Sequence, residues 1–241
     1  MSPRALIIAL DGPAGAGKST VAKMVAERAG LALVDTGAIY RTVALLALQE
    51  GVSVDDADGL GRIARTLPAR LRFVVQGGSN RVFLDPADHS GDAPLELTAG
   101  IRSHEVSAAA SSVARHPSVR SALLDLQRAL GRRGNGSVLE GRDIGTVVFP
   151  DADVKAFVTA SPQERARRRL HELQDKGTVG DETFDSVLRD IIARDKQDAE
   201  RPVAPLKAAD DAVIVDTTGK TLDQVTDEIL ALVDQARKTK S

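Results

Sequence analysis

The chain has 241 residues with 32 basic and 34 acidic side chains, a net charge of −2, so no global field would hold it on nucleic acid or on an anionic membrane. It contains no cysteine and four scattered histidines, which excludes disulfides and thiolate metal sites and argues against a zinc site. Aromatic residues make up 2% of the chain, which argues against recognition of bases by aromatic stacking.

The first apolar run, 5–10, is too short for the core of a signal peptide, and no later run approaches the length of a membrane span. We therefore expect a cytoplasmic monomer whose partners are small molecules, with no nucleic-acid or membrane partner. The length fits one domain that carries substantial insertions.

Strands buried on both faces are indicated by continuous runs of valine, isoleucine, leucine and alanine. Five such runs are 5–10, 31–34, 137–139, 154–158 and 212–215. Helical patterns separate most of them, and this alternation predicts a doubly wound α/β fold with a parallel sheet.

Helix start and stop signals follow the first two strands. We expect a helix over 17–29 that ends at Gly30, a second over 38–50 that ends at Gly51, and a third that is capped by Asp55. The first helix should bury Val21, Met24, Val25 and Ala29.

The middle of the chain interrupts the rhythm of strand and helix. Between Pro68 and Asp92, two short alternating runs flank Gly77-Gly78, which predicts an antiparallel hairpin in a small inserted subdomain. Helices should follow over 103–114 and 117–130, separated at His116 because the residue before proline avoids helical geometry.

A basic helical segment follows the fourth strand. The run Ser161-Pro162-Gln163-Glu164 predicts a capping box, 177–180 predicts a break, and 181–199 predicts a long helix. The tail 237–241 should be a frayed helix end.

The strongest functional motif is the loop Gly12 to Thr20, placed between the first strand and the first helix. Its spacing lets bare backbone wrap round a polyphosphate, with N–H groups and the helix N-terminus facing the negative charge. Lys18 would reach the terminal phosphates and Ser19 would offer its hydroxyl to Mg²⁺. The alternative is a plain glycine turn, which would not need the lysine, the hydroxyl and both flanking elements.

Two further motifs follow predicted strands, where ligands collect in open α/β sheets. In 35–41, Arg41 would face a ligand, or it would be an exposed arginine on a capped helix. In 140–143, a glycine beside Arg142 and Asp143 suits a ligand that carries a phosphate and an amino group, such as cytosine, or it forms a surface turn with an ion pair.

Two arginine-rich faces lie on the later helices. Arg194, Asp198 and Arg201 share one face, which could grip a sugar and a phosphate or form a simple charge pair within the helix. Arg165, Arg168 and Arg169 suggest a flap that closes over polyphosphate, or a solvated basic helix.

Taken together, the segments 12–20, 35–41, 140–150 and 201–206 resemble the bacterial cytidylate kinase family, nucleoside monophosphate kinases of the P-loop class. The resemblance covers nearly the whole chain, and the last three segments in this order and spacing are specific to that family. It implies a P-loop three-layer α/β fold with a central parallel sheet, an inserted small antiparallel monophosphate-binding subdomain and a helical lid. Within one domain, the core would be 1–36, 134–160 and 202–241, the monophosphate-binding region 37–133, and the lid 161–201.

The activity implied by the resemblance is phosphorylation of CMP and dCMP by ATP in pyrimidine nucleotide metabolism, with Mg²⁺ as cofactor. The implied ATP-binding positions are Gly12, Pro13, Ala14, Gly15, Ala16, Gly17, Lys18, Ser19 and Thr20, joined by Arg165, Arg168 and Arg169 as donor-side candidates. Ser19 would be the metal ligand.

Carried over by position, the implied CMP-binding residues are Thr36, Arg41, Ser111, Arg120, Arg142, Asp143, Arg194, Asp198 and Arg201. Arg41, Arg142 and Arg201 would clamp the acceptor phosphate. Ser111, Arg120 and Asp143 would read cytosine, and Arg194 with Asp198 would hold the sugar. Lys18, Arg142 and Arg201 are the expected catalytic residues.

Other functions fit parts of this pattern. A P-loop kinase could instead act on UMP, AMP or a metabolite hydroxyl, and a hydroxyl acceptor would demand a catalytic base near Asp35 or Asp143. A nucleotide-dependent switch protein would show slow hydrolysis without any acceptor. A nucleic-acid binding module would show binding that depends steeply on salt.

Overall fold

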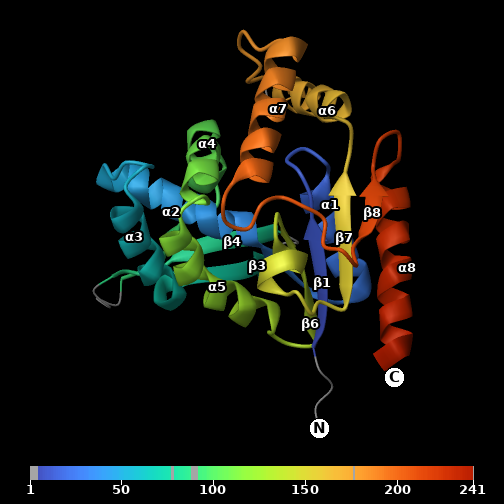
Figure 1. Cartoon of the computed structure of the whole chain (residues 1–241). Coiled ribbons are helices and arrows are strands. Elements are labelled where there is room, and N and C mark those ends of the chain that lie inside the picture. Colours follow the sequence, from blue (N-terminus) through green and yellow to red (C-terminus); the bar gives the residue numbers. More distant parts are fainter. Residues whose placement is uncertain (1–4, 77–78, 88–91, 176, 241) are drawn as a thin grey trace. The chain divides into compact units, whose positions relative to one another are not determined.

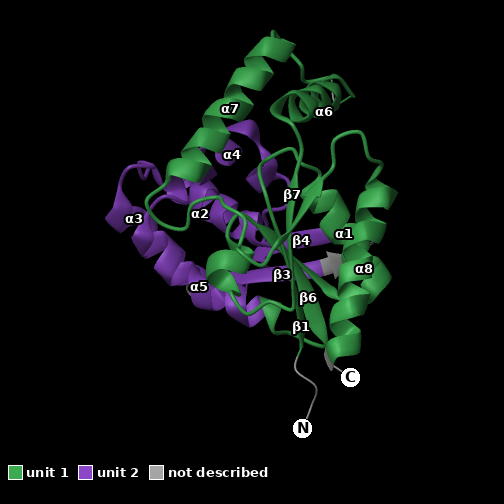
Figure 2. Cartoon of the chain, turned by 45° about the vertical axis from the view of Figure 1, so that its right-hand side comes forward, with its two compact units in different colours: residues 1–34, 131–241 green, residues 35–130 purple. Residues whose placement is uncertain are grey.

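The computed structural model describes residues 5–76, 79–87, 92–175 and 177–240. The chain divides into two compact units, residues 1–34 with 131–241 and residues 35–130 (Figure 2). We call them unit 1 and unit 2. The division of roles among a core, a monophosphate-binding region and a lid stays a prediction.

Unit 1 is built on strands that alternate with helices (Figure 1). Its elements are β1 Leu6–Asp11, α1 Lys18–Ala29, β2 Ala32–Asp35, β6 Gly136–Gly141, the π-helical turn η2 Ile144–Val148, β7 Val154–Thr159, α6 Pro162–Asp175, α7 Phe184–Glu200, β8 Val213–Asp216 and α8 Leu222–Lys240. Its sheet has the order β2-β6-β1-β7-β8, with β1 in the centre.

The pairings around β1 bring the carboxyl ends of three strands to one edge. Strand β1 runs parallel to both β6 and β7, and Asp11 has Gly141 and Phe157 as its register partners. Strand β7 runs parallel to β8 in turn. Residues that follow these strands therefore meet at one edge of the sheet.

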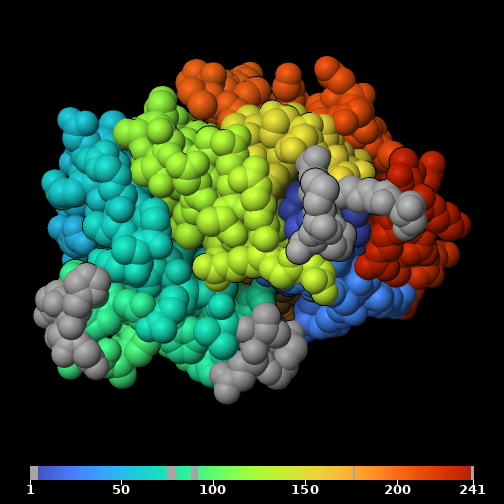
Figure 3. Space-filling view, turned by 90° about the horizontal axis from the view of Figure 1, so that it is seen from below, coloured from blue at the N-terminus to red at the C-terminus, as the bar shows by residue number. Residues whose placement is uncertain are grey.

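The core of unit 1 lies between the sheet and the helices α1 and α8. Ile8, Leu10 and Val158 from the strands pack with Val25 of α1 and Ile229 of α8, all fully buried. At the surface, Arg28 near the end of α1 pairs with Asp223 and Asp227 of α8. Figure 3 shows red atoms of the C-terminal part of the chain beside blue atoms of its N-terminal part. The predicted helix face is confirmed for Val21 and Val25, whereas Met24 and Ala29 are half-buried.

Unit 2 combines helices with a small antiparallel sheet of order β3-β4-β5. Its elements are α2 Thr36–Glu50, α3 Ala57–Arg70, β3 Leu71–Gln76, β4 Ser79–Leu84, β5 Leu95–Glu96, the 3-10 turn η1 Gly100–Arg102, α4 His104–Val113 and α5 Pro117–Gly131. Helix α2 packs against α3 and α4.

The predicted fold class is confirmed, with a parallel central sheet flanked by helices and a small antiparallel sheet. All five predicted strands of the central sheet are present, and the predicted hairpin pairs Leu71–Gln76 with Ser79–Leu84. Gly77 and Gly78, which were expected to form its turn, lie outside the described residues.

Several local predictions were wrong. Asp56, not Asp55, caps α3, because its carboxylate accepts the Gly59 N–H at 3.0 Å. The small sheet also extends past Asp92, because Leu95–Glu96 adds a third strand by pairing with β4. Pro68 lies inside the last turn of α3, where the missing N–H removes one helical hydrogen bond.

Helix boundaries differ elsewhere by a few residues. Helix α2 begins at Thr36 rather than at residue 38, because the Asp35 carboxylate caps it through the Ala38 N–H. Helix α7 begins at Phe184 rather than at residue 181, because Thr183 and Ser186 form a reciprocal capping box. The Ser161 hydroxyl accepts the Glu164 N–H at 3.2 Å, which is one half of the capping box predicted there.

Candidate active site

The loop after β1 has a backbone that only glycine tolerates at key positions. Gly12, Gly15 and Gly17 have φ of 145°, 76° and 84°. A Cβ atom on Gly12 would lie 1.9 Å from the Val158 carbonyl oxygen, so any side chain there would clash with β7. The loop therefore presents bare backbone beside the central strands.

Helix α1 begins directly after this loop and carries no side-chain cap at Gly17. The N–H groups of its first turn are thus available to an anion, and the helix dipole favours negative charge there. Lys18 lies in this turn, only 6% exposed, and its ammonium donates to the Pro13 carbonyl at 2.6 Å. Burial, and next the nearby Arg142, lowers the pKa of Lys18 well below its usual value. A bound polyphosphate would oppose this shift, because its negative charge favours the charged ammonium group.

A hydroxyl and a carboxylate meet next to this lysine. The Ser19 hydroxyl donates to Glu140 Oε2 at 2.6 Å, and Glu140 lies buried near the carboxyl end of β6, the strand beside β1. Oxygen donors of this kind suit Mg²⁺, which is bound through one or two protein oxygens together with substrate phosphates. The pair fits a magnesium ion, although the described residues contain no cluster of three or more acidic, histidine or cysteine side chains.

Sequence reasoning placed Glu140 in a motif but gave it no role. The signal was an acidic side chain at the end of the strand that neighbours the phosphate-loop strand. Strand order, which only the fold reveals, decides that neighbourhood.

The loop after β6 brings two predicted CMP-binding residues into ion pairs. Arg142 Nε lies 3.0 Å from Asp198 Oδ2 on α7, and Arg201 lies 3.5 Å from Asp143 Oδ1. Asp143, Asp198 and Arg201 are buried. The structure therefore gathers these four predicted residues into one cluster of alternating charge at the carboxyl edge of the sheet.

The segment after α7 holds Arg201 in place. Ala204 is the only non-glycine residue with positive φ in the described part of the chain, at 51°. Its carbonyl accepts a hydrogen bond from Arg201 Nε. The Leu206 N–H returns to the Asp198 carbonyl at 2.8 Å. This turn fixes the guanidinium of Arg201 beside Asp143.

Asp11, the last residue of β1, was not singled out from the sequence. Its carboxylate accepts the N–H groups of Ile144 and Gly145, each at 2.7 Å. Burial raises its pKa to about 6, and the two backbone N–H groups oppose that rise. No pattern of residue types marks a carboxylate that serves backbone N–H groups more than a hundred residues away.

The three arginines of α6 that were predicted on the donor side differ in their surroundings. Arg165 is 2% exposed and donates to the carbonyls of Ala160 and Ala14. It also pairs with Asp195 through its two terminal nitrogens, Nη1 and Nη2. Arg168 donates to Thr217, whose hydroxyl donates to the loop carbonyl of Ala16. Both residues are thus linked to the glycine loop.

Arg169, in contrast, pairs with Glu172 at the surface of α6. Arg194 on α7 is half-buried and close enough to influence the Lys18 pKa. Donation by Arg165, Arg168 or Arg169 to a donor phosphate stays a prediction.

Unit 2 holds the other predicted CMP-binding residues. Thr36 is buried in the first turn of α2, and Arg41, in the same helix, pairs with Asp35 at 2.6 Å. Arg120 of α5 is buried, and its guanidinium lies 5.5 Å from the centre of the Tyr40 ring. Ser111 is half-buried on α4, which packs against α2.

The chain matches the family model described as cytidylate kinase over residues 8–235. It is 47% identical to a cytidylate kinase from Exiguobacterium sp. over 97% of this chain and 99% of that protein. It is also 46% identical to a cytidylate kinase from Pelotomaculum thermopropionicum, over 96% of this chain and 97% of that protein. This chain belongs to the cytidylate kinase family.

This member of the cytidylate kinase family was also compared with solved structures. A thymidylate kinase from Candida albicans is 15% identical with a TM-score of 0.39, covering 100% of this chain and 96% of that chain. Among the residues that the structure describes, no helix is both long and apolar enough to cross a membrane.

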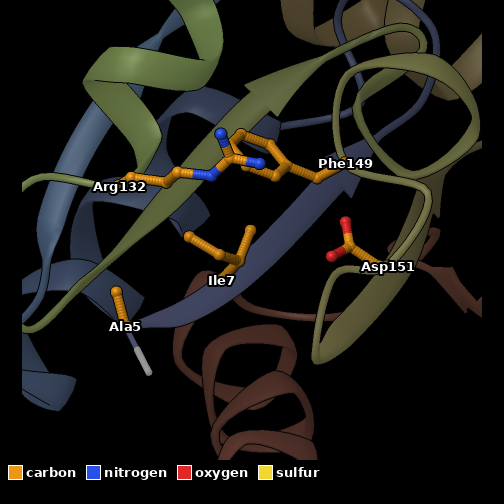
Figure 4. A pocket seen from close by; sticks show the side chains of 5 residues that line it. All are labelled: Ala5, Ile7, Arg132, Phe149 and Asp151. Atoms are coloured by element: carbon orange, nitrogen blue, oxygen red, sulfur yellow. The ribbon is translucent and has the colours of Figure 1, made fainter. Parts of the chain in front are cut away.

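One cavity of this cytidylate kinase family member lies away from the glycine loop. It has a volume of about 270 Å³ and is lined by Ala5, Ile7, Arg132, Phe149 and Asp151. Figure 4 shows the Arg132 guanidinium over the Phe149 ring, 5.6 Å from its centre. The cavity lies near the amino end of β1, so the catalytic candidates do not line it.

Proposed function

We propose that this chain transfers the γ-phosphoryl group of ATP to CMP and dCMP, giving CDP and dCDP, as part of pyrimidine nucleotide metabolism in the cytoplasm. One observation carries the proposal. The glycine loop with buried Lys18 follows β1 and Arg142 follows β6, so both lie at the carboxyl edge of one parallel sheet, and Arg201 after α7 pairs there with Asp143. Two groups of cations at one edge suit two anionic ligands.

On the donor side, the N–H groups of residues 12–20 would surround the tripolyphosphate of ATP, with Lys18 reaching its terminal phosphates. Arg168 is hydrogen-bonded to Thr217 beside the loop and its side chain is partly exposed, so it could reach a donor phosphate. Arg165 and Arg169 remain donor-side candidates. Ser19 and Glu140 would hold Mg²⁺, which when bound would neutralise phosphate charge.

On the acceptor side, Arg142 and Arg201 would bind the CMP phosphate, and Arg41 would join them. Their carboxylate partners hold these guanidinium groups in fixed positions before substrate arrives. An incoming phosphate offers arginine the same paired oxygen geometry as a carboxylate, so it can take over these contacts.

Base and sugar selection would fall to the remaining residues. Asp143 would accept from the exocyclic amine of cytosine, whereas uracil presents a carbonyl there and would be repelled. Ser111 and Arg120 would complete the contacts to the base, and Thr36 would also contact CMP. Asp198 and Arg194 would hold a sugar hydroxyl that ribose and deoxyribose share.

The reaction needs no catalytic base. The acceptor is a phosphate whose second pKa is about 6, so near neutrality its oxygen is already a nucleophile. Phosphoryl transfer depends on alignment and on neutralising the charge that spreads over the equatorial oxygens. Lys18, Arg142 and Arg201 would supply that neutralisation while the lid excludes water.

An acceptor panel tests the function directly. Purified protein with ATP and magnesium is offered CMP, dCMP, UMP, AMP and a set of hydroxyl metabolites, and ADP release is followed by a coupled assay. We expect CMP and dCMP to give the highest kcat/KM. A preference for UMP, AMP or a hydroxyl, or ADP release that is equal without any acceptor, would contradict the proposal.

Variants of the base-reading residues sharpen the same test. Asp143→Asn and Arg120→Ala should each weaken CMP recognition by about 1 to 3 kcal/mol, the value of a good polar contact to a base. Arg167→Gln, an exposed residue that pairs only at the surface with Glu164, is the matched control and should leave CMP kinetics unchanged. Unchanged CMP kinetics in both base variants would remove these residues from the pocket.

A further inference from the structure

Asp11 is a buried charged residue that the proposed reaction does not use. It is 6% exposed at the end of the central strand, between its register partners Gly141 of β6 and Phe157 of β7. The next residue, Gly12, starts the phosphate loop. A carboxylate in this position has to be stabilised by hydrogen bonds, because burial disfavours its charged form.

The partners of Asp11 belong to the other loop of the candidate site. Its two oxygens accept one N–H each, from Ile144 and Gly145, at 2.7 Å. These are the first two residues of the turn η2, directly after Arg142 and Asp143 in the chain. Asp11 therefore fastens the end of β1 to the backbone that carries the acceptor residues.

Backbone hydrogen bonds connect Asp143 and Ile144 to the residues that follow in and after the turn η2. The Asp143 carbonyl accepts the N–H groups of Val147 and Val148, and the Phe149 N–H closes on the Ile144 carbonyl at 2.7 Å. Gly145 has little free space, because a Cβ atom there would lie 3.4 Å from Asp11 Oδ2 and 3.2 Å from the Lys155 side chain.

Charge around Asp11 also links the two loops. The negative charge of Asp143 raises the pKa of Asp11, and the positive charge of Lys18 lowers it. The charge state of Asp11 therefore depends on one residue from each loop. A buried carboxylate with a raised pKa at the ligand edge of the sheet is more common at working sites than in ordinary cores.

We propose that Asp11 is a positioning residue that locks the acceptor loop, residues 141–145, against the start of the phosphate loop. Its two hydrogen bonds keep Arg142 and Asp143 in register with Lys18. This inference rests on the proposed function, because it treats Arg142 and Asp143 as acceptor contacts.

The test is Asp11→Asn, which keeps the shape but turns an NH₂ group toward a backbone N–H, so one of the two hydrogen bonds is lost. Hydrogen bonds to a charged group are worth enough that kcat/KM for CMP should fall about 10- to 100-fold. The Kd for ATP with magnesium, measured by calorimetry without acceptor, should stay within about threefold, because the phosphate loop keeps its own backbone. Assays at pH 8 keep the CMP phosphate dianionic.

The matched control is Asp153→Asn. Asp153 Oδ2 accepts the Ile7 N–H at 2.8 Å, the same kind of bond to the same strand at its other end. This variant should lose stability without changing kcat/KM for CMP. If Asp11→Asn does not fold, Gly145→Ala replaces it. A Cβ atom there would lie 3.2 Å from the Lys155 side chain, tighter than ordinary contact, so the backbone that donates to Asp11 should shift and kcat/KM should fall a few-fold in the same direction.

Three outcomes overturn the inference. One is a kcat/KM for CMP in Asp11→Asn, or in Gly145→Ala where that variant has to be used, that matches Asp153→Asn. Another is a loss of ATP affinity as large as the loss for CMP, which would place the effect in the phosphate loop alone. The third is a wild-type protein that prefers another acceptor while Asp11→Asn leaves kinetics with that acceptor unchanged.

A different acceptor by itself tells against the proposed function alone. In that case the comparison of Asp11→Asn with Asp153→Asn is run with the acceptor that the wild type uses, and a loss confined to Asp11→Asn supports the positioning role. The two proposals therefore fail separately.

Discussion

The two ends of the parallel sheet in unit 1 are built from the same strands but differ in what they bury. At the carboxyl end, Asp11, Lys18, Glu140 and Asp143 are all at most 6% exposed. At the amino end, which Figure 3 views, the cavity combines apolar side chains with Arg132 stacked over Phe149 (Figure 4).

This difference separates stability from function. Buried charge is costly unless it is paired, and apolar residues of similar volume would often hold a fold equally well. Strand β1 itself shows the contrast, with Ile7 at one end and Asp11 at the other. We therefore expect the carboxyl end to bind ligands, whereas the amino end contributes to packing.

The largest expected effect is on turnover. Lys18→Ala should lower kcat at least about 100-fold, because it removes a preorganised cation from the developing phosphate charge. Steady-state kinetics on folded protein checks this, with circular dichroism as the folding criterion. Lys23→Ala, which breaks only an exposed pair with Glu27, is the control. Near-native turnover in Lys18→Ala would contradict the claim that the buried charges at the carboxyl end of the sheet serve catalysis.

Arg165 tests whether the charges at the carboxyl end also hold the fold. Arg165→Met should lower the free energy of unfolding by about 2 to 3 kcal/mol, because it leaves Asp195 and the carbonyls of Ala14 and Ala160 without their donor. Urea denaturation measures it. The exposed Arg167→Met should stay within about 0.5 kcal/mol of wild type, and equal losses in both variants would contradict this prediction.

The pKa of Asp11 predicts a pH dependence of stability. Because its folded pKa is raised from 3.8 to about 6, the folded state binds more protons than the unfolded state between these values, so stability falls as pH rises through that window. From pH 7 to pH 5, wild type should gain about 1 kcal/mol relative to Asp11→Asn. Denaturation curves at both pH values measure the difference, and parallel pH dependences would contradict the assignment.

The smallest effect is expected at the amino end. Arg132→Ala removes a cation from the face of Phe149 and should cost about 1 kcal/mol or less. Thermal denaturation measures this loss, and kcat/KM for CMP should not change. A large drop in activity would mean that the two ends of the sheet are not functionally distinct.

Much of this architecture could be predicted from local pattern. The parallel strands, the helix stops at Gly30 and Gly51, and the hairpin strands follow from hydrophobic periodicity and glycine chemistry, which act within a few residues. Errors occurred where neighbouring residues compete, as when Asp56 rather than Asp55 capped α3. The short strand Leu95–Glu96 was missed because two residues carry no periodic signal.

The sequence by itself determined the phosphate loop, because its glycines, lysine and hydroxyl are adjacent in the chain and their geometry is local. Tertiary structure alone decided that Glu140 lies beside Ser19, that Asp11 holds the turn after Asp143, and that Arg165 is enclosed by acceptors. Those pairings depend on strand order and helix packing, and residues that far apart leave no pattern in their spacing.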